Sequence, residues 1–273
     1  MKQLLFCFMI GAAGLVASCS KIINPVSATN ASASLRVMAY NIHHANPPSR
    51  SDSIDLEAIV NTIRVQHPDL VALQEVDVNT ERSGKFNQAE EIAKKLDMHY
   101  YFGKAIDHQG GDYGVAILSK FPLSETAVHR LPTKSETKGE PRVLATARVR
   151  LPDGTFIQFG STHLDAQKAP ENRQLQVEEI GRIAAVENLP FIIAGDFNAT
   201  PETDIVATLD KHFTRTCQRC EPTIPVINPT KTIDYIAFKH PTGKFTVVSH
   251  QVIGERYASD HLPVVAVVAV SLR

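Results

Sequence analysis

The 273-residue chain contains no tryptophan, only 7% aromatic residues and four cysteines, and its charges nearly cancel, with 28 Lys and Arg against 29 Asp and Glu. A neutral balance disfavours proteins that hold duplex nucleic acid mainly through Lys and Arg contacts to phosphates. The scarcity of aromatic residues disfavours proteins that insert rings into a bilayer. The sequence also lacks an H-E-x-x-H motif, a P-loop and a G-x-S-x-G turn, which excludes the best-marked zinc, nucleotide and serine sites.

The first residues have the pattern of an export signal, with Lys2, an apolar run over residues 4–17 and small residues before Cys19. This ending resembles the lipobox of bacterial lipoproteins, which implies a diacylated Cys19 as a new N-terminus. Because Ser20 follows, the resemblance implies an outer-membrane location, on the periplasmic or the surface face. A conventional signal peptide with an incidental cysteine is the alternative. We therefore predict a signal peptide over residues 1–18, a polar tether over 19–34 and one folded domain over 35–273.

Once Cys7 and Cys19 are assigned to the N-terminal segment, Cys217 and Cys220 remain as a pair. Export implies an oxidising environment, which favours a local disulfide between them. Half of a zinc site is the weaker alternative, because no second Cys or His pair at ligand spacing accompanies them.

Two hydrophobic periodicities alternate through the predicted domain. Amphipathic stretches predict helices over residues 54–66, 87–96 and 171–186. Several strand-like runs, such as VVAVVAV near the C-terminus, are apolar throughout, which indicates sheets covered on both faces. We therefore predict an α/β protein in which two sheets pack together with helices outside. The predicted strands cover residues 36–42, 69–76, 113–119, 143–151, 155–163, 191–197, 233–238, 244–253 and 263–270.

Six of these apolar runs begin or end in acids, amides or histidines, and each such residue alone is an ordinary turn residue. If the six ends converge, their carboxylate and amide oxygens suit Mg²⁺, Mn²⁺ or Ca²⁺, and such an ion polarises a phosphoryl oxygen. Histidines beside acids can also transfer protons near neutral pH. With no motif for a nucleophilic side chain, attack by metal-assisted water is preferred. The polar residues are Asn41, Gln74 and Glu75, Thr162 and His163, Asp196 and Asn198, Asp234, and Asp260 and His261.

The stretches LQEV, GDFNATP and SDHLPV occur in this order, beginning at residues 73, 195 and 259. Together they resemble the endonuclease/exonuclease/phosphatase superfamily over about residues 35–270. The resemblance implies a four-layer α/β/β/α sandwich of two mixed, mostly antiparallel sheets. It also implies a Mg²⁺-dependent hydrolase of phosphate esters, with Mn²⁺ or Ca²⁺ as alternative ions.

The resemblance also implies catalytic roles. Asp196 would orient or deprotonate the attacking water, and Asn198 would hold a phosphate oxygen. His261, oriented by Asp234, would contact the scissile phosphate, while His163 would assist the leaving group. The general base is either Asp196 or the pair of Asp234 and His261, and both alternatives stay open here.

Metal and substrate contacts are implied in the same way. Arg82 and Arg142 are candidate substrate contacts, with surface ion pairs as the alternative for both. Val115 stands where many phosphatase-like members have an asparagine that contacts phosphate, so Tyr113 or Asp112 is the candidate replacement. The metal ligands that the resemblance implies are Glu75, Asn41 and Asp260.

The substrate class is less well defined than the reaction. Without residues 1–18 the chain has 27 basic and 29 acidic residues, so a phosphodiesterase acting on a small or extracellular phosphate ester is preferred, and we expect a monomer anchored to a membrane by its lipid. A secreted nuclease and a sphingomyelinase-like enzyme are the alternatives within the family. A surface lipoprotein that only binds ligands on the same fold would be expected to lack part of the constellation, yet Glu75, Asp196, Asn198, Asp234, Asp260 and His261 are all present.

Overall fold

The computed structural model describes Met1 and residues 33–50, 52–239 and 245–271. The predicted signal peptide apart from Met1, Cys19 and almost all of the predicted tether lie outside the described residues, as does residue 244 at the start of one predicted strand. No helix in the described part of the chain is both long and apolar enough to cross a membrane.

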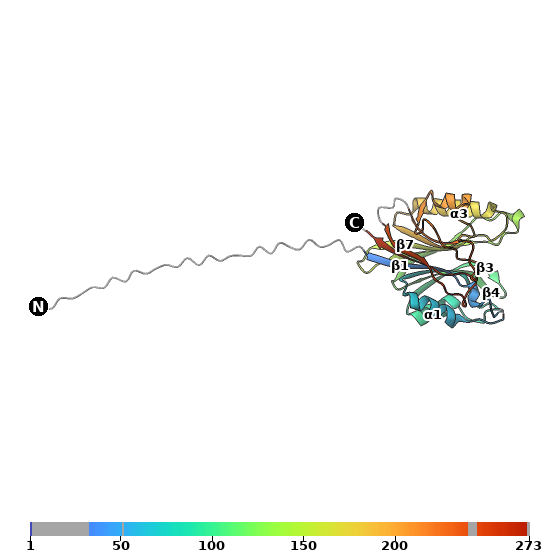
Figure 1. The fold of residues 1–273 in the computed structure, drawn as a ribbon, viewed down its shortest axis with the longest axis horizontal. Helices are drawn as coiled ribbons and strands as arrows, with labels where there is room; N and C mark the ends of the chain where they lie inside the picture. The colour runs from blue at the N-terminus through green and yellow to red at the C-terminus, as the bar shows by residue number, and fades with distance from the viewer. Residues whose placement is uncertain (2–32, 51, 240–244, 272–273) are drawn as a thin grey trace. The chain divides into compact units, whose positions relative to one another are not determined.

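Two six-stranded sheets form the centre of the fold, and Figure 1 shows α3 and α1 on opposite outer sides of them. The first sheet contains, in spatial order, β11 (Phe245–Val252), β12 (Val264–Val270), β1 (Ala33–Asn41), β2 (Leu70–Val78), β4 (Gly111–Ser119) and β3 (His99–His108). The second contains β5 (Leu123–Arg130), β6 (Val143–Arg150), β7 (Phe156–His163), β8 (Phe191–Asp196), β10 (Asp234–Lys239) and β9 (Phe213–Arg215).

Parallel pairing is confined, within the described strands, to one central pair in each sheet. β1 pairs with β2 and β7 with β8 in parallel, and the other neighbours are antiparallel. The helices are α1 (Leu56–Gln66), α2 (Gln88–Leu96), α3 (Glu171–Val186), α4 (Asp204–Leu209) and the 3-10 turns η1 (His43–Ala45) and η2 (Ser135–Thr137). The predicted α/β/β/α sandwich of mixed, mostly antiparallel sheets is therefore confirmed.

Three layers of hydrophobic core alternate with the secondary-structure layers. One layer lies between the sheets, one between the first sheet and α1 and α2, and one between the second sheet and α3 and α4. Along β1, Val37 and Ala39 join the core between the sheets, whereas Met38 and Tyr40 join the core beneath the helices. Since neighbouring side chains of a strand point to opposite faces, a strand covered on both faces must be apolar at every position.

Each predicted strand and helix has an observed counterpart, whereas β3, β5 and β9 were not predicted. All three lie at the edge of a sheet, where a strand has one neighbour and polar side chains are tolerated, so its hydrophobic pattern is weak. The short helix α4 begins three residues after Pro201 and is capped by Thr203, whose Oγ1 accepts from the amide of Val206 at 3.4 Å. The predicted disulfide between Cys217 and Cys220 is present.

Candidate functional site

Three polar side chains meet at one end of the second sheet because their strands pair in register. His163 at the end of β7 is opposite Asp196 at the end of β8, and Asp196 is opposite Asp234 at the start of β10. Directly opposed residues on paired strands present their side chains on the same face of a sheet. His163, Asp196 and Asp234 therefore form a contiguous group, and all three are buried.

His261, which precedes β12, completes this group from the loop outside the sheet. Its Nδ1 lies 3.0 Å and 3.2 Å from the two carboxylate oxygens of Asp234, and its Nε2 lies 3.8 Å from Oδ2 of Asp196. Thr223 donates a hydrogen bond of 2.5 Å from Oγ1 to Oδ2 of Asp234. Asp234 is thus held by two groups and orients the imidazole of His261 toward Asp196.

Asn41 connects this group to the first sheet. Its Nδ2 donates to Oε1 of Glu75 at 3.1 Å and to Oδ2 of Asp196 at 3.2 Å. Ser259 fixes the arrangement from behind, because its Oγ donates to the backbone carbonyl of Asn41 at 2.7 Å and accepts from the amide of His261 at 3.2 Å. The candidate site therefore spans both sheets, and in this orientation Asn41 is a donor to both carboxylates.

Glu75 points into the site because β2 is irregular at this position. The register of β2 against β4 shifts between Leu73 and Val76, and Glu75 has a φ of 58°. A bulge of this kind turns a side chain away from the regular alternation of the strand. Burial tends to raise the pKa of Glu75, but the groups around it, led by the His44 imidazole, outweigh burial and hold the pKa well below its usual range.

The two histidines beside Asp196 have opposite protonation states. Burial tends to lower the pKa of His261, but the negative charge and hydrogen bond of Asp234, helped by Asp196, outweigh it and raise the pKa to about 10. Burial and the nearby Arg142 cation both lower the pKa of His163 well below its usual range. His261 is therefore a cation at neutral pH and His163 is neutral, a separation typical of groups with distinct acid and base roles.

Arg142 also fixes the tautomer of His163. Its NH1 donates to Nδ1 of His163 at 3.0 Å and lies 3.3 Å from a carboxylate oxygen of Glu140. Since a guanidinium only donates, Nδ1 of the neutral ring must be the acceptor, and the ring proton is on Nε2. That Nε2 lies 3.5 Å from Oδ2 of Asp196, so His163 presents an N–H group to the site.

Asp196 is the carboxylate on which these donors converge. Burial and the adjacent negative charge of Asp234 raise its pKa, against the opposing effect of His261. The backbone amide of Asn198 also donates to Oδ1 of Asp196 at 2.8 Å. Asp196, Asp234 and His261 each offer an atom within 4.8 Å of the others, so this buried group could hold a metal ion. Two carboxylates and one imidazole do not identify the metal.

The structure places the remaining predicted site residues less centrally. Asn198 has a φ of 48° in the turn after β8, and its side-chain amide donates to the carbonyl of Leu164 at 3.0 Å. Asp260 is half-buried, and its charge contributes to the raised pKa of His261. Asp260 belongs to neither group of potential metal-binding acids and histidines found among the described residues.

Arg82 forms an ion pair with Asp77, as in the alternative to a substrate contact. Its guanidinium donates from Nε and NH2 to the two oxygens of the buried Asp77, at 2.7 Å and 2.9 Å, and lies 5.5 Å from the centre of the Tyr113 ring. Asp112 pairs with Lys104, with Nζ of Lys104 2.6 Å from Oδ1 of Asp112. Val115 lies in the core between the sheets and lines a small cavity with Tyr113, Arg142 and His163.

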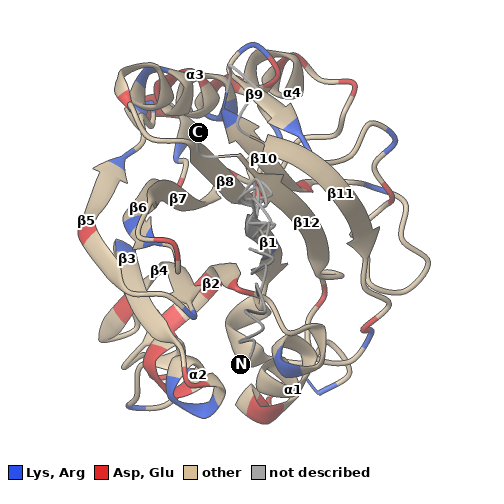
Figure 2. Cartoon of the chain, turned by 90° about the vertical axis from the view of Figure 1, so that its left-hand side faces the viewer, with Lys and Arg blue, Asp and Glu red and all other residues tan. Residues whose placement is uncertain are grey.

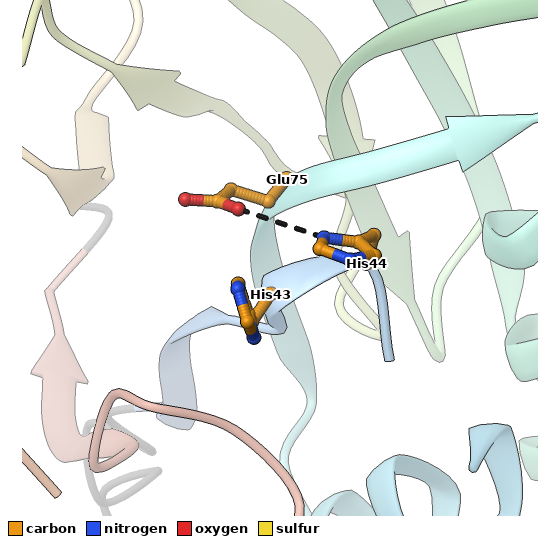
Figure 3. A group of neighbouring side chains, drawn as sticks. All are labelled: His43, His44 and Glu75. Carbon is orange, nitrogen blue, oxygen red and sulfur yellow. Dashed lines mark ion pairs between the residues drawn. The ribbon is translucent and has the colours of Figure 1, made fainter. Parts of the chain in front are cut away.

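His43 and His44 were not identified from the sequence, yet they lie with Glu75 in a second group whose ligand atoms are within 4.8 Å of one another. Figure 3 shows the Glu75 carboxylate facing the two imidazoles. The signal was the histidine doublet directly after the predicted strand end at Asn41 and Ile42. The sequence did not reveal the role of this doublet, because its two rings approach Glu75 of β2 only through the turn η1, which was not predicted.

The model of the Endonuclease/Exonuclease/phosphatase family matches residues 38–261. This range contains every site residue described above. No curated protein sequence matches the chain.

Three solved structures show the extent of the similarity. An endonuclease/exonuclease/phosphatase from Beutenbergia cavernae DSM 12333 has 25% identity and a TM-score of 0.75, over 87% of this chain and 72% of that one. The mannosyl-6-phosphatase of Bacteroides thetaiotaomicron VPI-5482 has 20% identity and a TM-score of 0.69, over 86% and 99%. ANGEL2, a 2',3'-cyclic phosphatase, has 15% identity and a TM-score of 0.68, over 88% and 96%. The last two similarities show a shared fold.

Proposed function

Because the chain belongs to the endonuclease/exonuclease/phosphatase family, we propose that it is a divalent-metal-dependent phosphoric ester hydrolase, with phosphodiesters as the preferred substrate class. The observation that carries the proposal is the convergence of Asn41, His163 and His261 on one buried oxygen of Asp196. A purely structural carboxylate needs its hydrogen bonds satisfied, but it does not need a cationic and a neutral histidine on the same oxygen.

Glu75 is the carboxylate that would hold the metal, with Asn41 and Asp260 as the further ligands that the family resemblance implies, and Mg²⁺ is the ion that the resemblance favours. When bound there, a divalent ion neutralises charge on a phosphoryl oxygen and lowers the pKa of a bound water. The oxygen-rich surroundings of Asp196 fit such an ion, because Asp196 and Asp234 lie side by side with no Lys or Arg bonded to either among the described residues.

Asp196 is the proposed general base. The His261 ring donates from Nδ1 to Asp234 and is cationic at neutral pH, so it is suited to binding an anionic phosphate oxygen through Nε2. Asp196 has a raised pKa, which favours proton uptake from an attacking water near neutral pH. His163, which presents Nε2–H, would donate a hydrogen bond to the leaving oxygen, and Asn198 would contact a phosphate oxygen after turning from Leu164.

The surroundings of the site favour a small phosphorylated substrate. A cavity of about 430 Å³ beside Asn198 is lined by Lys168, Arg173 and Lys231 among other residues, and its size suits a small molecule. In the view of Figure 2, Lys and Arg are interspersed with Asp and Glu along the described chain, and the net charge of −1 is not the basic balance expected of a duplex binder. The mannosyl-6-phosphatase and the 2',3'-cyclic phosphatase are consistent with phosphate ester chemistry and leave monoesters and diesters both open.

The metal requirement and the ester class can be tested together. We expect the purified protein to hydrolyse bis-p-nitrophenyl phosphate faster than p-nitrophenyl phosphate in Mg²⁺ or Mn²⁺, and EDTA to abolish both activities. Excess metal should restore them. If neither these esters nor a wider panel of nucleotides and sugar phosphates is hydrolysed in any metal, the enzyme proposal is wrong. Faster hydrolysis of the monoester would still support a phosphoric ester hydrolase, but it would make monoesters the preferred substrates.

The lipid anchor is a separate proposal, supported by the sequence pattern before Cys19. We expect the full chain, expressed in a bacterium that processes lipoproteins, to incorporate labelled palmitate and to fractionate with the outer membrane. Cys19→Ala should lose the label and be released into the soluble fraction, whereas the control Cys7→Ala should behave as the wild type. Equal labelling of the wild type and Cys19→Ala would contradict the proposal.

A further inference from the structure

We propose that His43, His44 and Glu75 form a binding site for a divalent transition-metal cation such as Mn²⁺, Fe²⁺ or Zn²⁺, in preference to Mg²⁺. The site would supply two imidazole nitrogens and one carboxylate oxygen. This inference deepens the proposed function, on which it rests for its catalytic meaning, because it specifies the kind of metal held at Glu75.

The three side chains are close enough to share one ion. Their ligand atoms lie within 4.8 Å of one another, and Nδ1 of His44 is 4.0 Å from Oε2 of Glu75. That separation is too long for a hydrogen bond. Two ligand atoms that are each about 2.1 Å from one ion lie about 3.4 Å apart at a tetrahedral angle, so a small closing movement of His44 and Glu75 would let them share an ion. Figure 3 shows this contact as a dashed line, with the His43 ring on the same side of the carboxylate.

His43 is oriented as a metal-binding histidine usually is. Its Nδ1 lies 2.8 Å from the backbone carbonyl of Asn46, and because a carbonyl only accepts, Nδ1 carries the proton. Nε2 of the neutral ring therefore has a free lone pair. Metal-ligating histidines typically donate their second ring nitrogen to a carbonyl or carboxylate in this way.

His44 provides a second, independent observation. Its Nδ1 is buried and has no hydrogen-bond partner within the described structure, although buried polar atoms are almost always paired. The backbone carbonyl of His44 accepts a 2.7 Å hydrogen bond from Nε2 of Gln88, which fixes the turn that carries the ring. An unpaired nitrogen facing a carboxylate is explained if a cation lies between them.

The backbone at all three donors is also strained. His43, His44 and Glu75 have φ values of 46°, 43° and 58°, in the left-handed region that residues other than glycine rarely occupy. Such conformations persist where the surrounding structure enforces them, and they concentrate at functional sites. Relaxing any one of these residues toward an ordinary conformation would turn its side chain away from the other two.

The donor set determines the preferred ion. Mg²⁺ favours oxygen ligands and keeps much of its water, whereas imidazole nitrogens suit Zn²⁺, Fe²⁺ and related ions. The two oxygens of the Glu75 carboxylate have different partners: Oε1 accepts a hydrogen bond from Asn41, and Oε2 faces His44. A cation at Oε2 would therefore be coupled through Asn41 to Asp196 without displacing the bond that joins the two sheets.

Equilibrium dialysis of the metal-stripped full chain, without substrate, tests the site directly. We expect Mn²⁺ and Zn²⁺ to bind at least tenfold more tightly than Mg²⁺. His43→Asn and His44→Asn, chosen because asparagine tolerates a positive φ, should weaken Zn²⁺ binding at least tenfold. His99→Ala, at an exposed histidine of β3, is the control and should bind as the wild type. Unchanged Zn²⁺ binding in both variants would overturn the proposal.

A spectroscopic measurement keeps the proposal testable if the histidine variants fail to fold, because it does not need them. Pulsed electron paramagnetic resonance of bound Mn²⁺ should show nitrogen coupling from imidazoles in the wild type and also in His261→Gln, which lacks the imidazole of the other candidate group. The absence of nitrogen coupling in either protein would also overturn the site. Both measurements are independent of turnover. Nitrogen-coupled Mn²⁺ in a protein that hydrolyses no ester would refute the proposed function alone, whereas Mg²⁺-supported hydrolysis without nitrogen coupling would refute this inference alone.

Discussion

Asp196→Asn is expected to lower kcat by about 10²- to 10⁴-fold, the usual contribution of a positioned general base. Asparagine preserves the size of the side chain but cannot take a proton from water, while Asn41, His163 and His261 still surround the position. Steady-state kinetics on the better of the two test esters measures the effect. Asp107→Asn, at an exposed carboxylate paired with Lys104, is the matched control and should keep wild-type turnover.

The same variant should change how stability depends on pH. The pKa of Asp196 is raised in the metal-free folded protein, so the fold favours the protonated carboxyl over the ionised one. Stability from this group is therefore present below its ordinary pKa and is lost as pH rises toward the raised value. Asparagine does not ionise, so Asp196→Asn should gain stability relative to the wild type as pH rises from about 4 to 8.

Urea unfolding in EDTA at several pH values measures this difference. A stability difference that is constant over pH would mean that Asp196 has an ordinary pKa in the fold. Near-wild-type kcat in Asp196→Asn would exclude it as the base and would favour the pair of Asp234 and His261.

Asp234→Asn is expected to lower the pKa of His261 well below its wild-type value of about 10. The carboxylate of Asp234 is the leading group that outweighs burial at His261, and burial alone disfavours the charged ring. A larger share of His261 would then be neutral near pH 7, and the ring would bind an anionic phosphate less well. We expect kcat to fall by about 10²- to 10³-fold, as for loss of one group that stabilises negative charge in the transition state.

The titration of His261 can be followed by NMR of the imidazole C–H signals in the metal-free protein, with His261→Gln to assign them. Asp260→Asn removes a smaller influence on the same ring and should lower its pKa much less. In the wild type, the raised pKa means that the protonated ring stabilises the fold fully below about pH 6.5 and loses this effect as pH rises through about 10. An unchanged His261 titration in Asp234→Asn would contradict the assigned role of Asp234.

The central strands of the fold could be predicted from the sequence because they are covered on both faces and are therefore apolar throughout. The continuous apolar runs of β8 and β12 leave a buried strand as the simplest interpretation, and both were predicted. Three edge strands, β3, β5 and β9, were not predicted, because one open side relaxes the demand for apolar residues, whereas the edge strand β11 was predicted.

The sequence by itself determined which chemical groups are available: carboxylates, amides and histidines at the ends of apolar strands, in an order that matches one family. Only the tertiary structure decided how they are used. Strand register sets Asp234 and His163 beside Asp196, and a bulge turns Glu75 into the site. The opposite protonation of His163 and His261 depends on which cation or carboxylate lies next to each ring. Distances between residues remote in sequence fix these properties, and no local pattern specifies them.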